Sequence, residues 1–400
     1  MNLLSNRLNN LSESETLAMT QKSRELKAQG FDVINLSIGE PDFDTPLLVK
    51  DAAKKAIDDN FTHYTPVSGY PELREAICRK LKRDNGLDYT PAQIVVSTGA
   101  KQSIANVMLC LINPGDEVIV PAPYWVSYKE IVKLAEGQSV YVPAFIDSNF
   151  KVTPEQVEAA ITPKTKAFIF SSPCNPTGSV YSKDELAGFA KMFARHPEIF
   201  IISDEIYEHI NFVGTHESIA QFGEIRDRVI IVNGLSKGCA MTGWRIGFVA
   251  APLFLAKACD KLQGQVTSGT CSIAQRAAIE AFDADPKKSK ELQDMVRTFH
   301  ERRDLMLGIL KDIPDMKTNL PDGAFYIFAN IRNYFGRTDG KYKIESCDDM
   351  ANYLLEKVYV ATVAGSAFGN PYCIRFSYAT SNELLIEAAN RIKKALAELK

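Results

Sequence analysis

Short runs of β-branched and aromatic residues alternate with longer amphipathic stretches through much of this chain. Stretches with helical periodicity, such as 101–111, 124–134 and 183–194, lie between most of these runs. Strands that are apolar on both faces and separated by helices predict an α/β fold with a mainly parallel sheet wound on both sides. Such sheets bind ligands beyond the carboxyl ends of their strands. The predicted strands are Ile94–Val96, Glu117–Val120, Ser139–Val142, Ala167–Phe170, Phe200–Ile202, Val229–Val232 and Ile246–Val249.

The pattern changes after about residue 285, which predicts a second, smaller α+β domain. A charged helix is expected over about 287–310 and a terminal helix from about Glu383, with strands at 325–328, 358–360 and 373–376. A chain of 400 residues suits two domains. We therefore expect a large domain over 46–285 and a small domain made of 1–45 and 286–400.

Charge and cysteine usage exclude several classes of function. The formal net charge of −3 gives no reason to expect nucleic acid or an anionic membrane as a partner. No apolar run is long enough to span a bilayer, and the first residues lack a signal-peptide core. The eight cysteines are scattered without a C-x-x-C pair, and none of the five histidines clusters with them. We expect a cytoplasmic protein without disulfides and without a metal site.

Lys237 follows the apolar run 229–232, at the end of a predicted buried strand. Burial disfavours the ammonium form and lowers the pKa, which leaves a free amine able to attack a carbonyl. An aldehyde cofactor would use such an amine. Arg245, eight residues later, suits an aldehyde that carries a phosphate.

Other strand ends carry residues with two interpretations each. Asp204 is a possible helix cap, or a partner for a protonated ring nitrogen, and Tyr207 is a packing residue or a donor to a ring oxygen. Asn175 stands in a turn between two prolines, and Trp125 belongs to the core or stacks on a planar ring. The turn 97–103 either binds phosphate at a helix N-terminus or is simply capped by Thr or Ser.

Arg375 lies within the apolar strand 373–376 and needs an anionic partner. A buried ion pair with a protein carboxylate and a bidentate clamp on a substrate carboxylate both meet that need. The segment 234–238 also matches G-x-S-x-G, the nucleophile turn of serine hydrolases, with Ser236 as nucleophile. That turn needs a helix directly after it, whereas another strand is predicted, and His300 is the only later histidine.

Taken together, these segments resemble the class I, fold-type I aminotransferases that depend on pyridoxal 5′-phosphate, and most closely their bacterial aspartate aminotransferase branch. The resemblance covers essentially the whole chain. Its motifs occur in family order: Gly39–Phe43, Tyr64–Pro66, Gly69–Arg74, Pro173–Gly178, Asp204–Tyr207, Ser236–Lys237 with Arg245, and Arg375.

The resemblance implies a role for each matching residue. Lys237 would hold the cofactor covalently and move the substrate proton, while Asp204 would pair with the ring nitrogen and Tyr207 with the ring oxygen. The remaining cofactor-binding residues would be Gly99, Ala100, Lys101, Trp125, Asn175, Ser236, Arg245 and, from the neighbouring chain of a homodimer, Tyr64. The substrate-binding residues would be Gly39, Trp125, Asn175, Arg375, Lys101 and Thr16.

The predicted activity is transfer of the amino group of L-aspartate to 2-oxoglutarate, by a ping-pong mechanism via pyridoxamine phosphate. Two departures from the family bear on it. Gly234 stands where a phosphate-binding hydroxyl is frequent, and the stretch 263–272 lacks the arginine with which animal-type enzymes bind the distal carboxylate. In place of that arginine, Lys101 would bind the distal carboxylate, helped by Thr16. An aromatic, prephenate or broad-specificity aminotransferase and, more remotely, a serine hydrolase or a cofactor-binding transcription regulator are the competing predictions.

Overall fold

The computed structural model describes residues 3–13 and 15–400, and a seven-stranded sheet dominates it. The order of its strands is β2-β8-β7-β6-β5-β3-β4. All pairs are parallel except β2–β8 and β7–β8, so β8 is the one antiparallel strand of this sheet as described. The strands are β2 (Ile94–Thr98), β3 (Glu117–Ala122), β4 (Gln138–Pro143), β5 (Thr165–Ser171), β6 (Phe200–Asp204), β7 (Val229–Gly234) and β8 (Ile246–Ala250).

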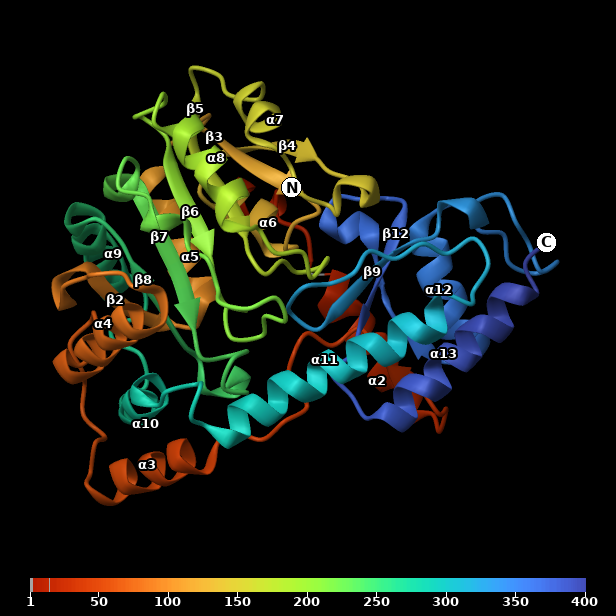
Figure 1. Ribbon diagram of the computed structural model, residues 1–400, viewed down its shortest axis with the longest axis horizontal. Coiled ribbons are helices and arrows are strands. Elements are labelled where there is room, and N and C mark those ends of the chain that lie inside the picture. The colour runs from red at the N-terminus through yellow and green to blue at the C-terminus, as the bar shows by residue number, and fades with distance from the viewer. Residues whose placement is uncertain (1–2, 14) are drawn as a thin grey trace.

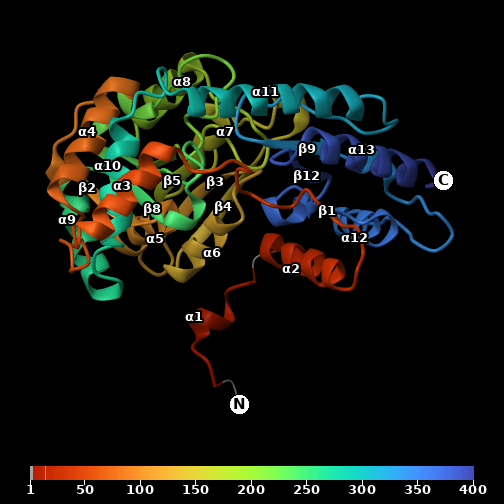
Figure 2. The same ribbon diagram turned by 90° about the horizontal axis from the view of Figure 1, so that it is seen from below.

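Helices cover both faces of this sheet (Figures 1 and 2). Alternate strand residues enter different hydrophobic clusters: Ile201 belongs to the cluster that includes α4, α8 and α10, and Ile202 to the one that includes α5, α6 and α9. This alternation follows from the two-residue period of a strand. The prediction of a doubly wound, mainly parallel α/β sheet is confirmed. The helices are α3 (Leu47–Asp58), α4 (Pro71–Asn85), α5 (Ala100–Leu111), α6 (Ser127–Leu134), α7 (Pro154–Glu158), α8 (Lys183–Phe193), α9 (Leu253–Val266) and α10 (Ser272–Asp283).

A smaller group of elements lies to the right of the sheet in Figure 1. It holds a three-stranded antiparallel sheet of order β11-β12-β9 and a parallel pair, β1–β10. The β1–β10 pair joins the N-terminal segment to the C-terminal part, which supports the predicted domain division; the boundaries stay a prediction. The elements are α2 (Glu15–Ala28), β1 (Ile34–Asn35), α11 (Lys290–Leu310), β9 (Tyr326–Asn330), α12 (Cys347–Val358), β10 (Val360–Ala361), β11 (Val363–Ala364), β12 (Cys373–Ser377) and α13 (Asn382–Ala397). The short helix α1 (Asn6–Asn9) contacts α6 instead.

Some element boundaries were predicted wrongly. The strand expected at 358–360 begins only at Val360, because α12 continues to Val358 and ends at Tyr359 in the left-handed conformation (φ 56°). The helix expected from Tyr124 begins at Ser127, and the Tyr124 N–H is bonded to the carbonyl of Phe368 in the C-terminal part. Local periodicity contains neither this contact nor the backbone geometry at Tyr359. Across residues 3–13 and 15–400, no helix combines the length and apolar character that crossing a bilayer requires.

Candidate active site

A cavity of about 330 Å³ lies at the carboxyl ends of the parallel strands, where the two groups of elements meet. It collects side chains from β6, from the turns after β5 and β7, from the start of α5 and from β12. Twelve of the fourteen residues predicted for the site line it: Thr16, Gly39, Ala100, Lys101, Trp125, Asn175, Asp204, Tyr207, Ser236, Lys237, Arg245 and Arg375.

The two other predicted residues lie outside the cavity wall. Gly99 directly precedes Ala100 and is buried beneath the Arg245 guanidinium. Tyr64 is fully exposed in the single chain, so this chain alone gives it no contact with the site. Its predicted role depends on a second subunit.

Lys237 lies in the turn that follows β7, with its amine facing the cavity. Nζ donates a hydrogen bond to the carbonyl oxygen of Gly39. Burial lowers the pKa of Lys237 to about 8, and the nearby carboxylate of Glu40 only partly opposes this effect. Across the described residues, no carboxylate forms an ion pair with this amine. About a tenth of the amine is therefore uncharged at pH 7, far more than in an ordinary lysine, and this form can act as a nucleophile or base.

Asp204 ends β6 and is almost completely buried. The hydroxyl of Tyr128 donates to Oδ2 at 2.6 Å, and the backbone N–H of Ile206 donates to Oδ1 at 3.3 Å. Burial raises the pKa of Asp204 to about 6, against the lowering effect of the Tyr128 hydrogen bond. A turn and not a helix follows β6, so Asp204 is not a helix cap. The site thus holds a buried carboxylate that a cationic group would stabilise.

The start of α5 and Arg245 form one end of the cavity. Gly99 is the N-cap of α5 with φ 83°, and neither Thr98 nor Ser97 caps the helix with its side chain. A Cβ on Gly99 would lie 2.1 Å from Nη2 of Arg245, so only glycine allows this approach. Arg245 is exposed and donates to the carbonyl oxygens of Thr98 and Thr242. The free N–H groups of a helix start beside a guanidinium suit a phosphate. Gly234 leaves no room for a hydroxyl, because a Cβ there would lie 2.6 Å from the Ile246 carbonyl oxygen.

Arg375 enters the cavity from β12 with 2% of its surface exposed. Nη1 donates to Oδ1 of Asn175 at 2.9 Å and Nη2 to the carbonyl oxygen of Ser37 at 2.7 Å, while Nε has no partner in the described part of the chain. No carboxylate of the described segments pairs with this guanidinium. The alternative of a buried protein ion pair is therefore not realised. A buried arginine without a carboxylate is suited to bind one from a ligand.

Aromatic side chains build the remaining walls. The hydroxyl of Tyr207 shares a hydrogen bond of 2.8 Å with that of Tyr326. Trp125 packs edge-on against Tyr128, and Nζ of Lys101 lies 5.1 Å from the Trp125 ring. Sequence reasoning missed Tyr128 and Tyr326, although Tyr128 follows Trp125 by three residues within the stretch predicted as helical, where such spacing favours one face. No motif marked Tyr326, since it reads as an ordinary residue of an apolar strand.

The hydrolase geometry does not form around Ser236. A turn follows it and leads to β8 without an intervening α-helix. His300 belongs to α11, where it lies 3.8 Å from Asp304 and stacks on Phe212. Ser236 faces the same cavity as Lys237.

Comparisons with known proteins agree with this geometry. Residues 32–392 match the family model described as aminotransferase class I and II. The chain is 48% identical to an aspartate/prephenate aminotransferase of Cereibacter sphaeroides, with full coverage of both, and 46% identical to a bifunctional aspartate and glutamate/aspartate-prephenate aminotransferase of Petunia hybrida, covering 99% of this chain and 83% of the relative. Among solved structures, it resembles an aspartate aminotransferase of Rhizobium meliloti (TM-score 0.96, 40% identity, full coverage of both) and one of Thermus thermophilus with maleate (TM-score 0.91, 39% identity, 99% and 100% covered).

Proposed function

The chain belongs to the class I and II aminotransferases, and from this premise we propose that it transfers the amino group of L-aspartate to 2-oxoglutarate. It is an enzyme of the transaminase type that uses pyridoxal 5′-phosphate. One observation carries the proposal. A buried guanidinium, Arg375, and an amine of lowered pKa, Lys237, open into one cavity, and neither is paired with a carboxylate of the described chain.

The residues of the cavity fit this cofactor. Asp204 offers a buried carboxylate for a ring nitrogen, and Lys237 offers the amine that an aldehyde requires. The close approach of Gly99 and Arg245 leaves a cradle at the start of α5 for the phosphate. When bound, the cofactor supplies an aldehyde and a cationic ring that accepts electrons from a breaking C–H bond.

Each remaining role belongs to a side chain of the cavity. Arg375 and Asn175 bind the α-carboxylate of the substrate and so fix the orientation of its Cα. Lys237 Nζ takes the proton from that Cα, and a pKa of about 8 suits this work because it is near the operating pH. Trp125 and Tyr207 hold the ring plane, Ser236 contributes to the phosphate end, and Lys101 with Thr16 receives the distal carboxylate.

Prephenate is the second candidate substrate. The relatives from Cereibacter sphaeroides and Nitrosomonas europaea are both described as aspartate/prephenate aminotransferases. The cavity wall also includes the apolar side chains of Leu17, Ile104 and Val126, which suit a substrate with a ring.

Absorption spectra of the cofactor-loaded enzyme test these proposals. Aspartate should convert the bound cofactor to its amino form and 2-oxoglutarate should reverse the change, whereas Lys237→Ala should abolish the conversion and the exposed Lys183→Ala should preserve it. Replacing 2-oxoglutarate by prephenate measures the second substrate. An enzyme that ignores aspartate but responds to other amino acids would refute the specificity and keep the chemistry.

Two further properties belong to the proposal. A homodimer is supported by Tyr64, whose exposed side chain would acquire a function only against a second subunit. A cytoplasmic location is supported by the eight cysteines, all of which are free thiols in the structure.

A further inference from the structure

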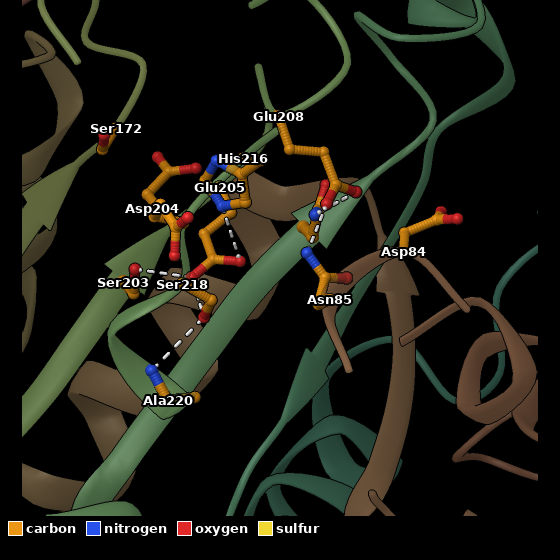
Figure 3. Close-up of polar contacts among 12 residues, drawn as sticks. Asp84, Asn85, Ser172, Ser203, Asp204, Glu205, Glu208, His216, Ser218 and Ala220 are labelled. Atoms are coloured by element: carbon orange, nitrogen blue, oxygen red, sulfur yellow. Dashed lines mark hydrogen bonds and ion pairs between the residues drawn. The ribbon is translucent and has the colours of Figure 1, made fainter. Parts of the chain in front are cut away.

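A buried cluster of two carboxylates and one imidazole lies beside the active-site turn and outside the cavity described above (Figure 3). Glu205 and Glu208 follow Asp204, the last residue of β6, and flank Tyr207 in the turn, while His216 comes from the following loop. One ligand atom from each of the three residues can be chosen so that all lie within 4.8 Å of one another. The chain thus folds back on itself to bring three potential metal ligands together.

Polar atoms in this cluster lack partners although they are buried. His216 is 6% exposed and Glu205 is 1% exposed. Neither ring nitrogen of His216 has a hydrogen-bond partner among residues 3–13 and 15–400, and the same holds for Oε2 of Glu205, although Nε2 and Oε2 are only 3.1 Å apart. A protonated His216 would satisfy Nε2 and Oε2 through this contact, which leaves Nδ1 of His216 as the buried polar atom that still requires an explanation, since buried polar atoms are nearly always satisfied.

The surroundings hold the carboxylates in place, and His216, when protonated, is the one group in the described part of the chain that forms an ion pair with Glu205. Oε1 of Glu205 accepts hydrogen bonds from Ser203 at 2.9 Å and Ser218 at 2.6 Å, which directs Oε2 toward His216. The Lys80 ammonium pairs with Glu208, and its charge offsets that carboxylate. In the described part of the chain, no lysine or arginine pairs with Glu205.

Glu208 retains capacity for a further ligand. Its Oε1 accepts from Lys80 and from Asn233, and its Oε2 accepts from Asn85 at 3.1 Å. A carboxylate offers about four lone-pair positions, so one remains on Oε2. Glu208 and His216 also line a second cavity of about 540 Å³ that reaches α11, which gives an ion a path to the cluster.

We propose that Glu205, Glu208 and His216 form a binding site for one divalent transition-metal ion, with Zn²⁺ as the ion that fits best. One imidazole and two carboxylates, completed by water, suit Zn²⁺, and bonds of about 2.0–2.2 Å would draw the three ligand atoms closer together. The ion would tie the turn that follows Asp204 and carries Tyr207 to the loop at His216. The scattered cysteines predicted no metal site, and this cluster contains none of them.

Calorimetric titration of the chelator-treated holoenzyme with Zn²⁺ tests the site. We expect one ion per chain, with affinity lowered at least about tenfold in Glu205→Gln and His216→Gln, since even lost supporting contacts weaken metal binding by that much. His300→Gln is the matched control, because His300 lines the same cavity but lies outside the cluster. Equal losses in His216→Gln and His300→Gln would overturn the proposal.

Co²⁺ added to the wild-type holoenzyme gives a second readout that needs no variant to fold. Binding at the cluster predicts visible ligand-field bands without a sulfur-to-metal charge-transfer band, and Zn²⁺ should displace them. A charge-transfer band would place the ion on a cysteine such as the exposed Cys271, and the proposal would be wrong. No binding at all would leave His216 and Glu205 as a metal-free pair and would equally refute it.

Discussion

At the scale of single residues, the site depends on ionisable groups that burial moves away from their ordinary behaviour. The pKa of Lys237 falls to about 8 and that of Asp204 rises to about 6, and in both cases loss of water is the main cause. Each shift disfavours the charged form, as burial must. In the folded protein without cofactor, burial of these two groups therefore lowers the free energy of unfolding, and bound ligands relieve this effect.

Lys237→Met should stabilise the cofactor-free protein at neutral pH. The folded-state pKa lies near 8 and the ordinary value is 10.5, so the cost of charging the amine is fully present below about pH 8. It disappears as the pH rises toward 10.5, because the wild-type folded state then binds fewer protons than the unfolded state. We expect a gain of up to about 3 kcal/mol at pH 7, since one pKa unit is about 1.4 kcal/mol.

Urea unfolding at pH 7 and pH 10 measures this effect. The exposed Lys183→Met is the control and should show no pH-dependent gain. If the gain in Lys237→Met is equal at the two pH values, it arises from better packing of the methionine and not from removal of the buried charge.

Tyr128→Phe should move the ionisation of Asp204 to higher pH. The hydroxyl donates to Oδ2 at 2.6 Å and stabilises the carboxylate, so its removal raises the pKa above about 6. Hydrogen bonds to charged groups contribute about 1.5–3 kcal/mol, which corresponds to about one to two pH units. As the pH is lowered, Asp204 becomes protonated and the affinity for the cofactor falls. In Tyr128→Phe this fall, measured by fluorescence titration, should begin at a higher pH than in the wild type. Tyr141→Phe, whose ring lies outside the cavity wall, should leave the profile unchanged.

At the scale of elements, the cofactor end of the cavity depends on how closely β8 approaches the start of α5. A Cβ on Gly247 would lie 2.2 Å from the backbone nitrogen of Ala100, and backbone atoms cannot yield as a side chain can. The strand and the helix therefore touch through a glycine on each side, Gly247 on β8 and Gly99 at the helix start. This contact sets the width of the proposed phosphate cradle.

Gly247→Ala should force α5 away from β8. Overpacking of this kind costs about 1–3 kcal/mol, and the displaced helix start should also weaken cofactor binding. Gly243→Ala is the control in the same segment, because no atom lies within 4 Å of its added Cβ. Thermal unfolding and cofactor titration of the two variants measure the difference. Equal behaviour of the two would show that the contact is looser than the structure indicates.

At the scale of the whole molecule, the predicted contact of one site residue requires a second subunit. Tyr64 is fully exposed in the single chain and lines no part of the cavity. In a homodimer it would reach the phosphate of the neighbouring subunit, as the family resemblance implies. The catalytic unit would then be the dimer, and stability would depend on protein concentration.

Mixing two defective variants tests this arrangement. Tyr64→Ala should weaken cofactor retention, and Lys237→Ala should be inactive. In a mixed dimer, the subunit with an intact Lys237 receives Tyr64 from its partner, so activity at limiting cofactor should rise above that of Tyr64→Ala alone. If Tyr64 acted within its own chain, mixing would restore nothing. Light scattering on the wild type gives the oligomeric state independently.

The sequence determined the secondary structure of the large sheet and the identity of most of the cavity wall. Apolar runs such as Val229–Val232 fold as strands because burial on both faces tolerates little else, and the carboxyl end of each parallel strand then places Asp204 and Lys237 at one edge. The sequence pattern predicted the ends of helices and strands less accurately than their presence. The end of α12 at Tyr359 depends on a left-handed residue, which periodicity does not reveal.

Only the tertiary structure excluded a protein carboxylate as the partner of Arg375 among the described residues. Arg375 reads the same in sequence whether a protein carboxylate or a ligand is its partner, and folding alone shows that Asn175 and Ser37 contact it while no described carboxylate does. The cluster of Glu205, Glu208 and His216 likewise depends on a loop returning over the turn after β6. The physical reason is common to both: burial and partner choice are properties of segments far apart in the chain, whereas sequence patterns report only on neighbours.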